Sequence, residues 1–242
     1  MSFDLIHNQI QAFLSAQKED PSALGNKCYK LPLSDALFCA EDVVRNRAFF
    51  QGIQQAIQER PERPLTVVDA GSGTGILGAF ALALGAEKCF FLEHNPHSLE
   101  LSKKLVDHLG FKEQSVFIEC DATQVELPEP YDILISETLS SGFVTEDFPR
   151  IVAHLKRYGK PGSVIIPERF RITMTEEDEG GRELEQTVWN IQSRKVAEDK
   201  RPIAKNQKTR SLCWHTKGWI YGDIAVESGD CMSFLNEIKT KY

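Results

Sequence analysis

The stretch Thr66–Gly78, TVVDAGSGTGILG, joins a short apolar run to a glycine-rich loop and then to a helical pattern. Residues Gly73–Gly78 match the G-x-G-x-x-G pattern that holds the pyrophosphate of a dinucleotide such as NAD. Two observations oppose that interpretation. Asp69 ends the apolar run, and a carboxylate beside a bound diphosphate repels it. Beginning the motif at position 73 would also extend the strand through Asp69–Ser72, a poor strand sequence, so we begin the turn at Gly71.

This loop suits a cationic ligand better than an anionic one. Gly71, Gly73 and Gly75 let the backbone turn sharply and let a ligand approach closely, and the next helix offers free N–H groups. S-adenosylmethionine carries a sulfonium, an ammonium and no phosphate, so Asp69 favours it. The segment VVDAGSGTG resembles motif I of class I S-adenosylmethionine-dependent methyltransferases. The alternative is a glycine turn that only packs a helix against a strand.

From residue 65 the chain alternates short apolar runs with helical patterns. The predicted strands are LTVVD, KCFFLE, SVFIEC, YDILIS and GSVIIP, and the predicted helices are Ile76–Leu84, Pro96–His108 and Phe148–Tyr158. This alternation is typical of a parallel sheet with helices on both faces, in which ligands bind at the carboxyl ends of the strands. We therefore predict an α/β fold, a doubly wound Rossmann-like sheet of the seven-stranded methyltransferase type.

The two flanks of this region have different patterns. Before it, we predict an amphipathic helix around Phe3–Leu14, a loop at Pro21–Pro32 and a helix over about Glu41–Arg60. After Pro167, the runs RFRITMT, LEQTVWNIQ, TRSLCWH and GWIYGDIAVE predict short strands separated by polar and glycine-containing stretches. The predicted organisation is N-terminal helices in residues 1–64, a methyltransferase core in 65–167 and a small β-rich annexe in 168–242.

Acidic residues follow the second and third predicted strands. Glu93 lies 18 residues after Gly75, close to the offset of about 20 residues at which an acidic residue reaches a ribose. Asp121 follows the third strand, where a carboxylate can accept a hydrogen bond from the exocyclic amine of adenine, and we place Ala122 in the same site. The alternatives are a solvent-facing Glu93 and an Asp121 that caps a turn.

The fourth strand ends in Ser136 and Glu137, and Glu146 follows nine residues later. This arrangement is similar to the double-glutamate loop of protein arginine methyltransferases, in which two glutamates flank the substrate guanidinium. A guanidinium is planar, cationic and carries five N–H donors, so two carboxylates can fix its plane and orientation. Alternatively, Glu146 only favours the start of the following helix, and Glu137 acts as a base for another acceptor.

A second similarity lies upstream, in EDVVRNRAFF, which resembles the helix that precedes motif I in that family. The resemblance implies that Arg45 binds the carboxylate of the cofactor's methionine; the alternative is a solvated arginine. The resemblance covers roughly Asp42 to Arg171. Between the glutamates Phe143 is the only aromatic residue, and the threonine-histidine-tryptophan loop is absent. We expect Trp214 and His215 to belong to the annexe core rather than to an acceptor pocket.

The composition is that of an ordinary folded protein. The chain has 242 residues, 41% hydrophobic and 26% charged, with a formal net charge of -7. The net negative charge gives no indication of a basic surface for nucleic acid and favours cationic ligands. The six cysteines show no zinc-ligand spacing, so we predict no metal and reduced thiols. The N-terminus does not resemble a signal peptide and no window resembles a membrane span, so we expect a cytoplasmic protein.

Together these features predict an S-adenosylmethionine-dependent N-methyltransferase. Its expected acceptor is a cationic guanidino or amino group, on a protein arginine or on a small guanidino compound. The alternatives are an O- or N-methyltransferase of an unrelated small metabolite and a non-catalytic, cofactor-binding partner of another methyltransferase. The oligomeric state stays open at this point.

Overall fold

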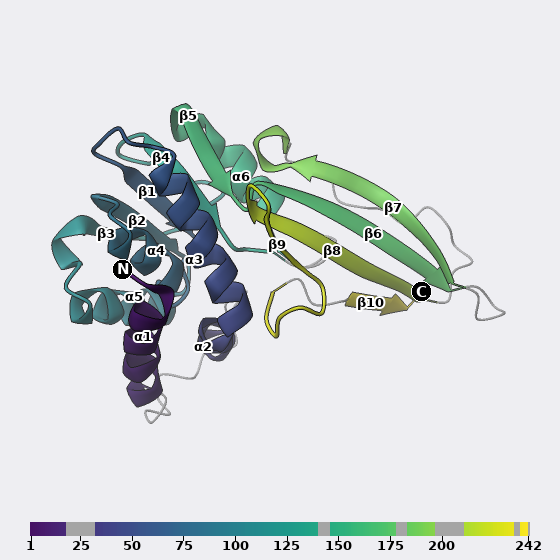
Figure 1. Cartoon of the computed structure of the whole chain (residues 1–242), viewed down its shortest axis with the longest axis horizontal. Helices are drawn as coiled ribbons and strands as arrows, with labels where there is room; N and C mark the ends of the chain where they lie inside the picture. Colours follow the sequence, from purple (N-terminus) through teal and green to yellow (C-terminus); the bar gives the residue numbers. More distant parts are fainter. Residues whose placement is uncertain (18–31, 140–145, 178–182, 197–210, 235–237, 242) are drawn as a thin grey trace.

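The computed structural model describes residues 1–17, 32–139, 146–177, 183–196, 211–234 and 238–241 (Figure 1). It contains a parallel sheet surrounded by helices and a long antiparallel sheet that projects away from it. Most of the predicted loop Pro21–Pro32 and the predicted aromatic Phe143 lie outside the described residues. The division of the chain after residues 64 and 167 stays a prediction.

The parallel sheet consists of β1 (Thr66–Ala70), β2 (Lys88–Glu93), β3 (Ser115–Glu119), β4 (Tyr131–Ser136) and β5 (Gly159–Ile166). Their order across the sheet is β3-β2-β1-β4-β5, and every neighbouring pair is parallel. The chain therefore reverses its direction of travel across the sheet between β1 and β4, which is where such sheets bind ligands. The predicted fold class is confirmed, with five parallel strands among the described residues.

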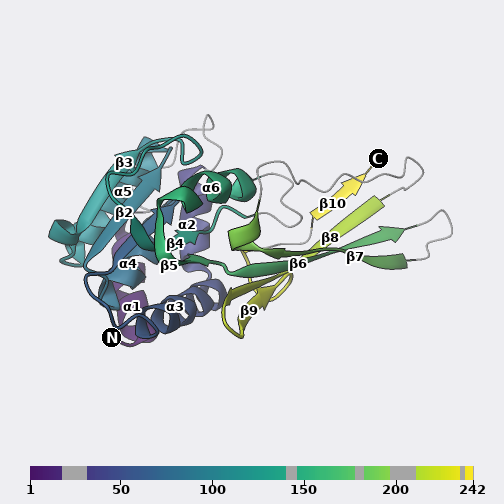
Figure 2. The same ribbon diagram turned by 90° about the horizontal axis from the view of Figure 1, so that it is seen from above.

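Helices cover both faces of this sheet, as right-handed crossovers require. The connections β1–α4–β2 and β2–α5–β3 progress in one direction, so α4 (Ile76–Ala83) and α5 (Pro96–His108) share a face. The connection β4–α6–β5 progresses in the other direction, so α6 (Phe148–Leu155) covers the opposite face (Figure 2). A 3-10 turn, η4 (Lys156–Tyr158), completes the segment that we predicted as one helix.

Three N-terminal helices pack onto α4 and α5: α1 (Phe3–Gln17), α2 (Leu33–Glu41) and α3 (Val43–Gln58). The prediction missed α2, and it began the next helix at Glu41 instead of Val43. The break between α2 and α3 falls at Asp42, whose side chain accepts a hydrogen bond from the Arg45 N–H and so caps α3.

The antiparallel sheet has the order β10-β8-β6-β7, with β9 on the free part of β8. Its strands are β6 (Arg169–Glu177), β7 (Glu183–Gln192), β8 (Ser211–Tyr221), β9 (Ile224–Glu227) and β10 (Ile238–Lys241), and a 3-10 turn, η5 (Ser193–Lys195), follows β7. The prediction of separate strands at TRSLCWH and GWIYGDIAVE was wrong. One strand, β8, runs through Gly218, which pairs with both β6 and β9, and the turn comes later, at Gly222.

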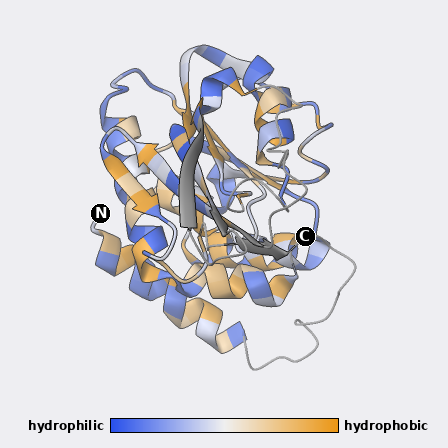
Figure 3. Cartoon of the chain, turned by 90° about the vertical axis from the view of Figure 1, so that its right-hand side faces the viewer, coloured by the Kyte–Doolittle hydropathy of each residue, from blue (hydrophilic) through white to orange (hydrophobic). Residues whose placement is uncertain are grey.

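One continuous hydrophobic core joins the two sheets. Side chains of β1 and β4, of α3 and of β6 and β8 belong to the same buried cluster. The helices carry hydrophilic residues beside hydrophobic ones, as surface helices of a globular protein do (Figure 3). None of the helices in the described ranges is long and apolar enough to cross a membrane.

Candidate functional site

The loop after β1 is hydrogen-bonded to the carboxyl end of β2. The N–H groups of Gly71 and Ser72 both donate to the carbonyl of Leu92, at 2.8 and 3.0 Å. The strand ends at Ala70, one residue later than predicted, and the turn begins at Gly71, as predicted, with a φ of 71°. A side chain at Gly71 would lie 2.4 Å from the Thr138 methyl group. Only glycine therefore fits this turn between the ends of β1 and β4.

Asp69 lies beneath this loop and is almost fully buried. Its Oδ2 accepts a hydrogen bond of 2.8 Å from the Gly78 N–H in the first turn of α4. Because the N-cap residue of α4 is Gly75, which has no side chain, Asp69 provides the carboxylate that this helix start otherwise lacks. Burial raises the pKa of Asp69 to about 7, against the lowering effects of the Gly78 N–H and of Arg45.

Glu93, at the end of β2, is hydrogen-bonded to the same loop. Its Oε2 accepts from the Gly73 N–H at 2.7 Å and its Oε1 accepts from the Asn95 N–H at 2.8 Å. Each carboxylate oxygen keeps a further lone-pair site, so Glu93 can also accept hydrogen bonds from a ligand with two hydroxyls. The structure thus brings Glu93 to the glycine loop, and its role at the ribose stays a prediction.

Asp121, after β3, takes part in a local turn. Its carboxylate accepts hydrogen bonds from the N–H and hydroxyl of Thr123, at 2.8 and 2.7 Å, and from the Gln124 side chain at 2.9 Å. Partial burial works to raise the pKa of Asp121, but these hydrogen bonds lower it, and His94 contributes to the lowering. This is the turn cap that we considered as an alternative. Ala122 beside it is partly buried against the core, and the adenine role of both residues stays a prediction.

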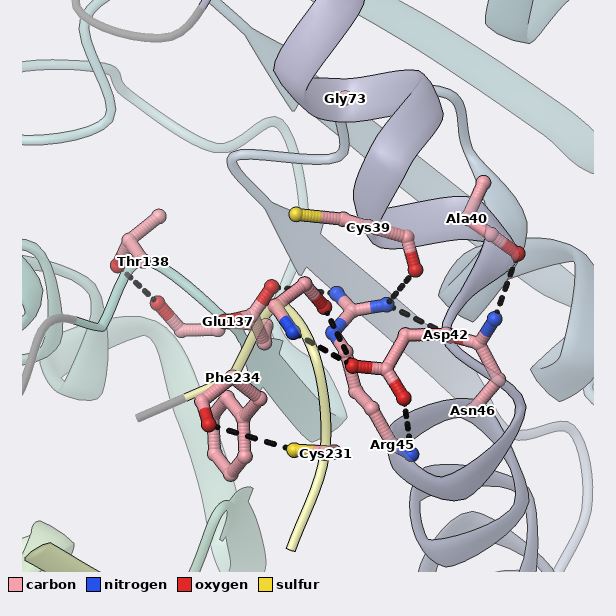
Figure 4. A network of polar contacts seen from close by, with 12 residues as sticks. Cys39, Ala40, Asp42, Arg45, Asn46, Gly73, Glu137, Thr138, Cys231 and Phe234 are labelled. Carbon is pink, nitrogen blue, oxygen red and sulfur yellow. Dashed lines mark hydrogen bonds and ion pairs between the residues drawn. The ribbon is translucent and has the colours of Figure 1, made fainter. Parts of the chain in front are cut away.

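Arg45 and Glu137 form a buried ion pair at the end of β4 (Figure 4). The Nη2 of Arg45 donates to Glu137, and its Nη1 donates to Asn46 Oδ1 at 2.7 Å and to the Cys39 carbonyl at 3.3 Å. Burial would lower the pKa of the Arg45 guanidinium, but Glu137 raises it above its ordinary value. Burial raises the pKa of Glu137, so its ionised form depends on Arg45. Arg45 is therefore not the solvated residue of the alternative interpretation.

The thiol of Cys39, on α2, lies close to charged groups of this site. Burial, together with the charge of Glu137 and a smaller contribution from Glu146, raises the pKa of Cys39 to about 11, against the lowering effects of Arg45 and Ser233. The charges of both glutamates therefore reach this thiol. The clamp role of the two glutamates stays a prediction.

The sequence analysis missed Asp42, Cys39 and Ser233. The buried carboxylate of Asp42 caps α3 and also accepts hydrogen bonds from the N–H and hydroxyl of Ser233, at 2.7 and 2.9 Å. The Asp42 signal was available, because an aspartate directly before a helical pattern is typical of an N-cap. Nothing in the sequence connects it to a serine 191 residues away.

These residues fit the cofactor that the sequence suggested. The Nε of Arg45 is buried without a hydrogen-bond partner among the described residues, so a ligand carboxylate can take it together with a neighbouring guanidinium N–H. Gly73 has a φ of 53°, which favours glycine, and a Cβ placed on it would contact Ala36 at 3.5 Å. The acidic groups Asp69, Glu93 and Glu137 surround this space and disfavour a pyrophosphate.

A model of the methyltransferase domain matches residues 61–221, which are 161 of the chain's 242 residues. The chain belongs to this methyltransferase domain family. The match runs from just before β1 to the end of β8, so it includes the glycine loop and Glu93. The predicted S-adenosylmethionine-dependent methyltransferase class is confirmed at this level.

Curated relatives of this methyltransferase domain act on arginine, according to their names. The histone-arginine methyltransferase CARMER of Anopheles gambiae is 25% identical over 68% of this chain and 26% of its own length. Protein arginine N-methyltransferase 6 of Xenopus laevis is 28% identical over 52% and 38%, respectively. The arginine N(omega)-methyltransferase of Streptomyces achromogenes is 28% identical over 54% and 37%. The chain thus matches little more than a third of these relatives' length at most.

Solved structures of similar fold carry related names. The Trypanosoma brucei PRMT1 enzyme–prozyme complex with AdoHcy has a TM-score of 0.62 and 15% identity, over 82% of this chain and 81% of that one. Arabidopsis thaliana protein arginine methyltransferase 10 has a TM-score of 0.66 and 14% identity, over 86% and 81%. At these identities the similarity establishes the fold of the methyltransferase domain and its antiparallel sheet.

The aromatic stretch of β8 pairs with β6 in the antiparallel sheet. Trp214 is buried in the common core, as expected for annexe packing. His215 is partly exposed and its Nε2 lies 3.8 Å from Glu227 on β9.

Proposed function

We propose that this chain is an S-adenosylmethionine-dependent N-methyltransferase whose acceptor is a guanidino group, on a protein arginine or on a small guanidino compound. The observation that carries the proposal is the buried pair Arg45–Glu137 at the switch point of a methyltransferase-domain sheet. Within this pair, we assign Arg45 to the cofactor, together with the glycine loop. We assign the Glu137 carboxylate to the cationic acceptor. The arginine-directed names of the curated relatives support the same acceptor class.

The cofactor side of the proposal rests on the loop after β1 and the residues fixed to it. Glu93 has two oxygens, each with one backbone N–H bound, that can accept from the ribose hydroxyls. Arg45, with its buried and unpartnered Nε, binds the methionine carboxylate. Asp121 and Ala122 lie after β3, on the side we assign to adenine. When bound, S-adenosylmethionine supplies a methyl group activated by a positively charged sulfur.

The acceptor side rests on charge. Glu137, Glu146 and the buried Asp42 are acidic, whereas Arg45 is the cation that the described residues place among them. A second cation therefore improves the balance of buried charge. A guanidinium presents parallel N–H donors that match a carboxylate, so Glu137 and Glu146 can hold it by two sides and fix its plane.

The work of the chain in this reaction is positional. Glu137 and Glu146 localise the positive charge of the guanidinium on the nitrogens that they bind, which leaves the remaining nitrogen more nucleophilic. The rigid glycine loop and Arg45 hold the donor, so donor and acceptor meet in a near-attack arrangement. The burial of the Arg45–Glu137 pair strengthens the attraction of Glu137 for the cation.

A screen for methyl transfer tests the proposal. The purified chain is incubated with labelled S-adenosylmethionine and with arginine-containing peptides, free arginine and other small guanidino or amino compounds. Label on a guanidino nitrogen is the expected result, and label on an amino or hydroxyl acceptor would move the chain to the other metabolite class. Calorimetry with S-adenosylmethionine, its demethylated product and NAD accompanies the screen.

Two outcomes would overturn the proposal at different levels. Cofactor binding at about micromolar affinity without any acceptor would favour the non-catalytic partner hypothesis. Absence of cofactor binding, or preference for NAD, would contradict every methyltransferase hypothesis for this chain.

A further inference from the structure

The segment Cys231–Phe234, which follows β9, lies against the start of α3 although the two are far apart in the sequence (Figure 4). Ser233 donates both its N–H and its hydroxyl to one oxygen of Asp42, at 2.7 and 2.9 Å. The other oxygen of Asp42 accepts from the Arg45 N–H at 3.1 Å. A single buried carboxylate thus holds both the helix that carries Arg45 and a segment of the C-terminal sheet.

The neighbours of Ser233 are residues of the acceptor side. Asp42, which binds Ser233, also accepts from the N–H of Arg45, and the Arg45 guanidinium pairs with Glu137. On α2, Ala36 lies beside Gly73 of the cofactor loop, and the Cys39 carbonyl one turn later accepts from Arg45. The helix α2 therefore runs from the cofactor loop to the Arg45–Glu137 pair, and the segment with Ser233 lies near its far end.

The segment is held at its end by packing that does not involve the Ser233 hydroxyl. Phe234 is fully buried, and its ring packs edge-on against Phe49 of α3 at a centroid distance of 5.4 Å. Cys231 is buried too and donates to the Phe234 carbonyl. The loss of one hydroxyl at Ser233 therefore loosens this wall without removing its anchor.

We propose that Asp42 and Ser233 form a latch that holds residues Cys231–Phe234 as one wall of the acceptor pocket. Ser233 is then a positioning residue for the acceptor, acting through Asp42 and the Arg45–Glu137 pair. The expected effect on acceptor kinetics rests on the proposed function. The latch itself is a property of the fold and does not depend on that function. The C-terminal sheet thereby contributes to acceptor selection, although the methyl donor is held by the parallel sheet.

The kinetic test compares Ser233→Ala with Ser233→Thr, which keeps a hydroxyl at the same position. For Ser233→Ala we expect KM for the acceptor to rise about tenfold, the usual effect of losing a hydrogen bond to a charged group. We expect kcat and the dissociation constant of the cofactor to stay within about twofold. Ser233→Thr should restore most of the acceptor KM.

Ser228→Ala is the matched control. Ser228 is also a buried serine of the C-terminal region, but its hydroxyl bonds to Thr216 of β8 rather than to Asp42. We expect this change to lower thermal stability and to leave the acceptor KM unchanged. An equal rise of KM in both alanine variants would show a general loosening of the sheet and would contradict the latch.

Thiol labelling tests the latch without any acceptor. Because Cys39 lies beside Ser233, loosening the wall should increase the rate at which iodoacetamide labels Cys39, followed by peptide mass spectrometry, by about threefold or more. Ser228→Ala should leave that rate unchanged. A wild-type labelling rate in Ser233→Ala would overturn the latch even if methyl transfer is found. Faster labelling without any methyl transfer would retain the latch and refute the proposed function.

Discussion

The cofactor side and the acceptor side of this site are built in different ways. The cofactor side is local: Asp69 binds Gly78 nine residues later, and Gly73 binds Glu93 twenty residues later. The acceptor side is assembled from distant segments, because Arg45 binds Glu137 across 92 residues and Asp42 binds Ser233 across 191. A local arrangement can be predicted from spacing, whereas a distant one depends on how two sheets pack.

The Arg45–Glu137 pair joins the two sides, and its removal should have the largest effect. We expect Glu137→Gln to reduce kcat for a guanidino acceptor about 10³-fold, because the amide no longer supplies the charge that the acceptor needs. The cofactor dissociation constant, measured by calorimetry, should change only a few-fold. This result would assign Glu137 to the acceptor side.

Glu129→Gln is the control for that change. Glu129 also pairs with a cation, Lys88, but it lies beside Thr66 at the start of β1, at the other end of the sheet. We expect wild-type turnover in this variant. Wild-type turnover in Glu137→Gln as well would refute the guanidinium clamp.

Asp69 should make the cofactor side sensitive to pH. Because its pKa is about 7 in the folded chain and near 3.8 when exposed, the folded state binds more protons between these values. The free energy of unfolding should therefore fall as pH rises through this window, by up to about 4 kcal/mol from Asp69. In Asp69→Asn this part of the pH dependence should vanish, as measured by urea unfolding at several pH values.

Asp132→Asn is the matched control for that experiment. Asp132 accepts a hydrogen bond from the Thr66 N–H at the other end of β1. Its replacement should leave the loss of stability between about pH 4 and about pH 7 in place. An unchanged pH profile in Asp69→Asn would show that Asp69 is ionised throughout and would refute the effect of its burial.

Glu93 offers a smaller and purely cofactor-side change. The glutamine of Glu93→Gln has one acceptor oxygen for two backbone N–H groups, so the loop and the ribose site both lose a partner. We expect the affinity for S-adenosylhomocysteine to fall about tenfold, with kcat at saturation nearly unchanged. Glu119→Gln changes the exposed neighbour at the end of β3 and should have no effect. A selective loss of acceptor affinity in Glu93→Gln would reverse the assignment of the two sides.

Tyr221 provides the smallest expected effect. Its hydroxyl donates to Glu59 at 2.7 Å, at the end of α3 that lies far from the site. Tyr221→Phe should lower the free energy of unfolding by about 1 kcal/mol and leave both KM values unchanged. A change in the acceptor KM would show that the two ends of α3 are coupled, and the comparison between the two sides would need revision.

The success of the sequence-based predictions also depends on whether a feature is formed by local or by distant contacts. Alternating apolar runs and helical patterns were sufficient for the five parallel strands, and Pro96–His108 was predicted to the residue. The nine-residue α2 was missed although Leu33, Ala36, Leu37 and Ala40 recur at helical spacing, because a short helix gives a weak pattern. The predicted strand GWIYGDIAVE began at Gly218, within β8, and ran through the turn at Gly222. The contact between Asp42 and Ser233 arises only from tertiary packing.

The helix α3 has a length that matters, because it touches the C-terminal sheet at both ends and in the middle. Asp42 holds Ser233 at its start, Gly52 allows Ile220 to approach closely, and Glu59 holds Tyr221 at its end. The length of α3 therefore fixes the spacing of these three contacts. One inserted residue would advance its end by about 1.5 Å and rotate it by about 100°. The contacts at its two ends could not then form together, so an insertion or deletion within α3 would break one of them.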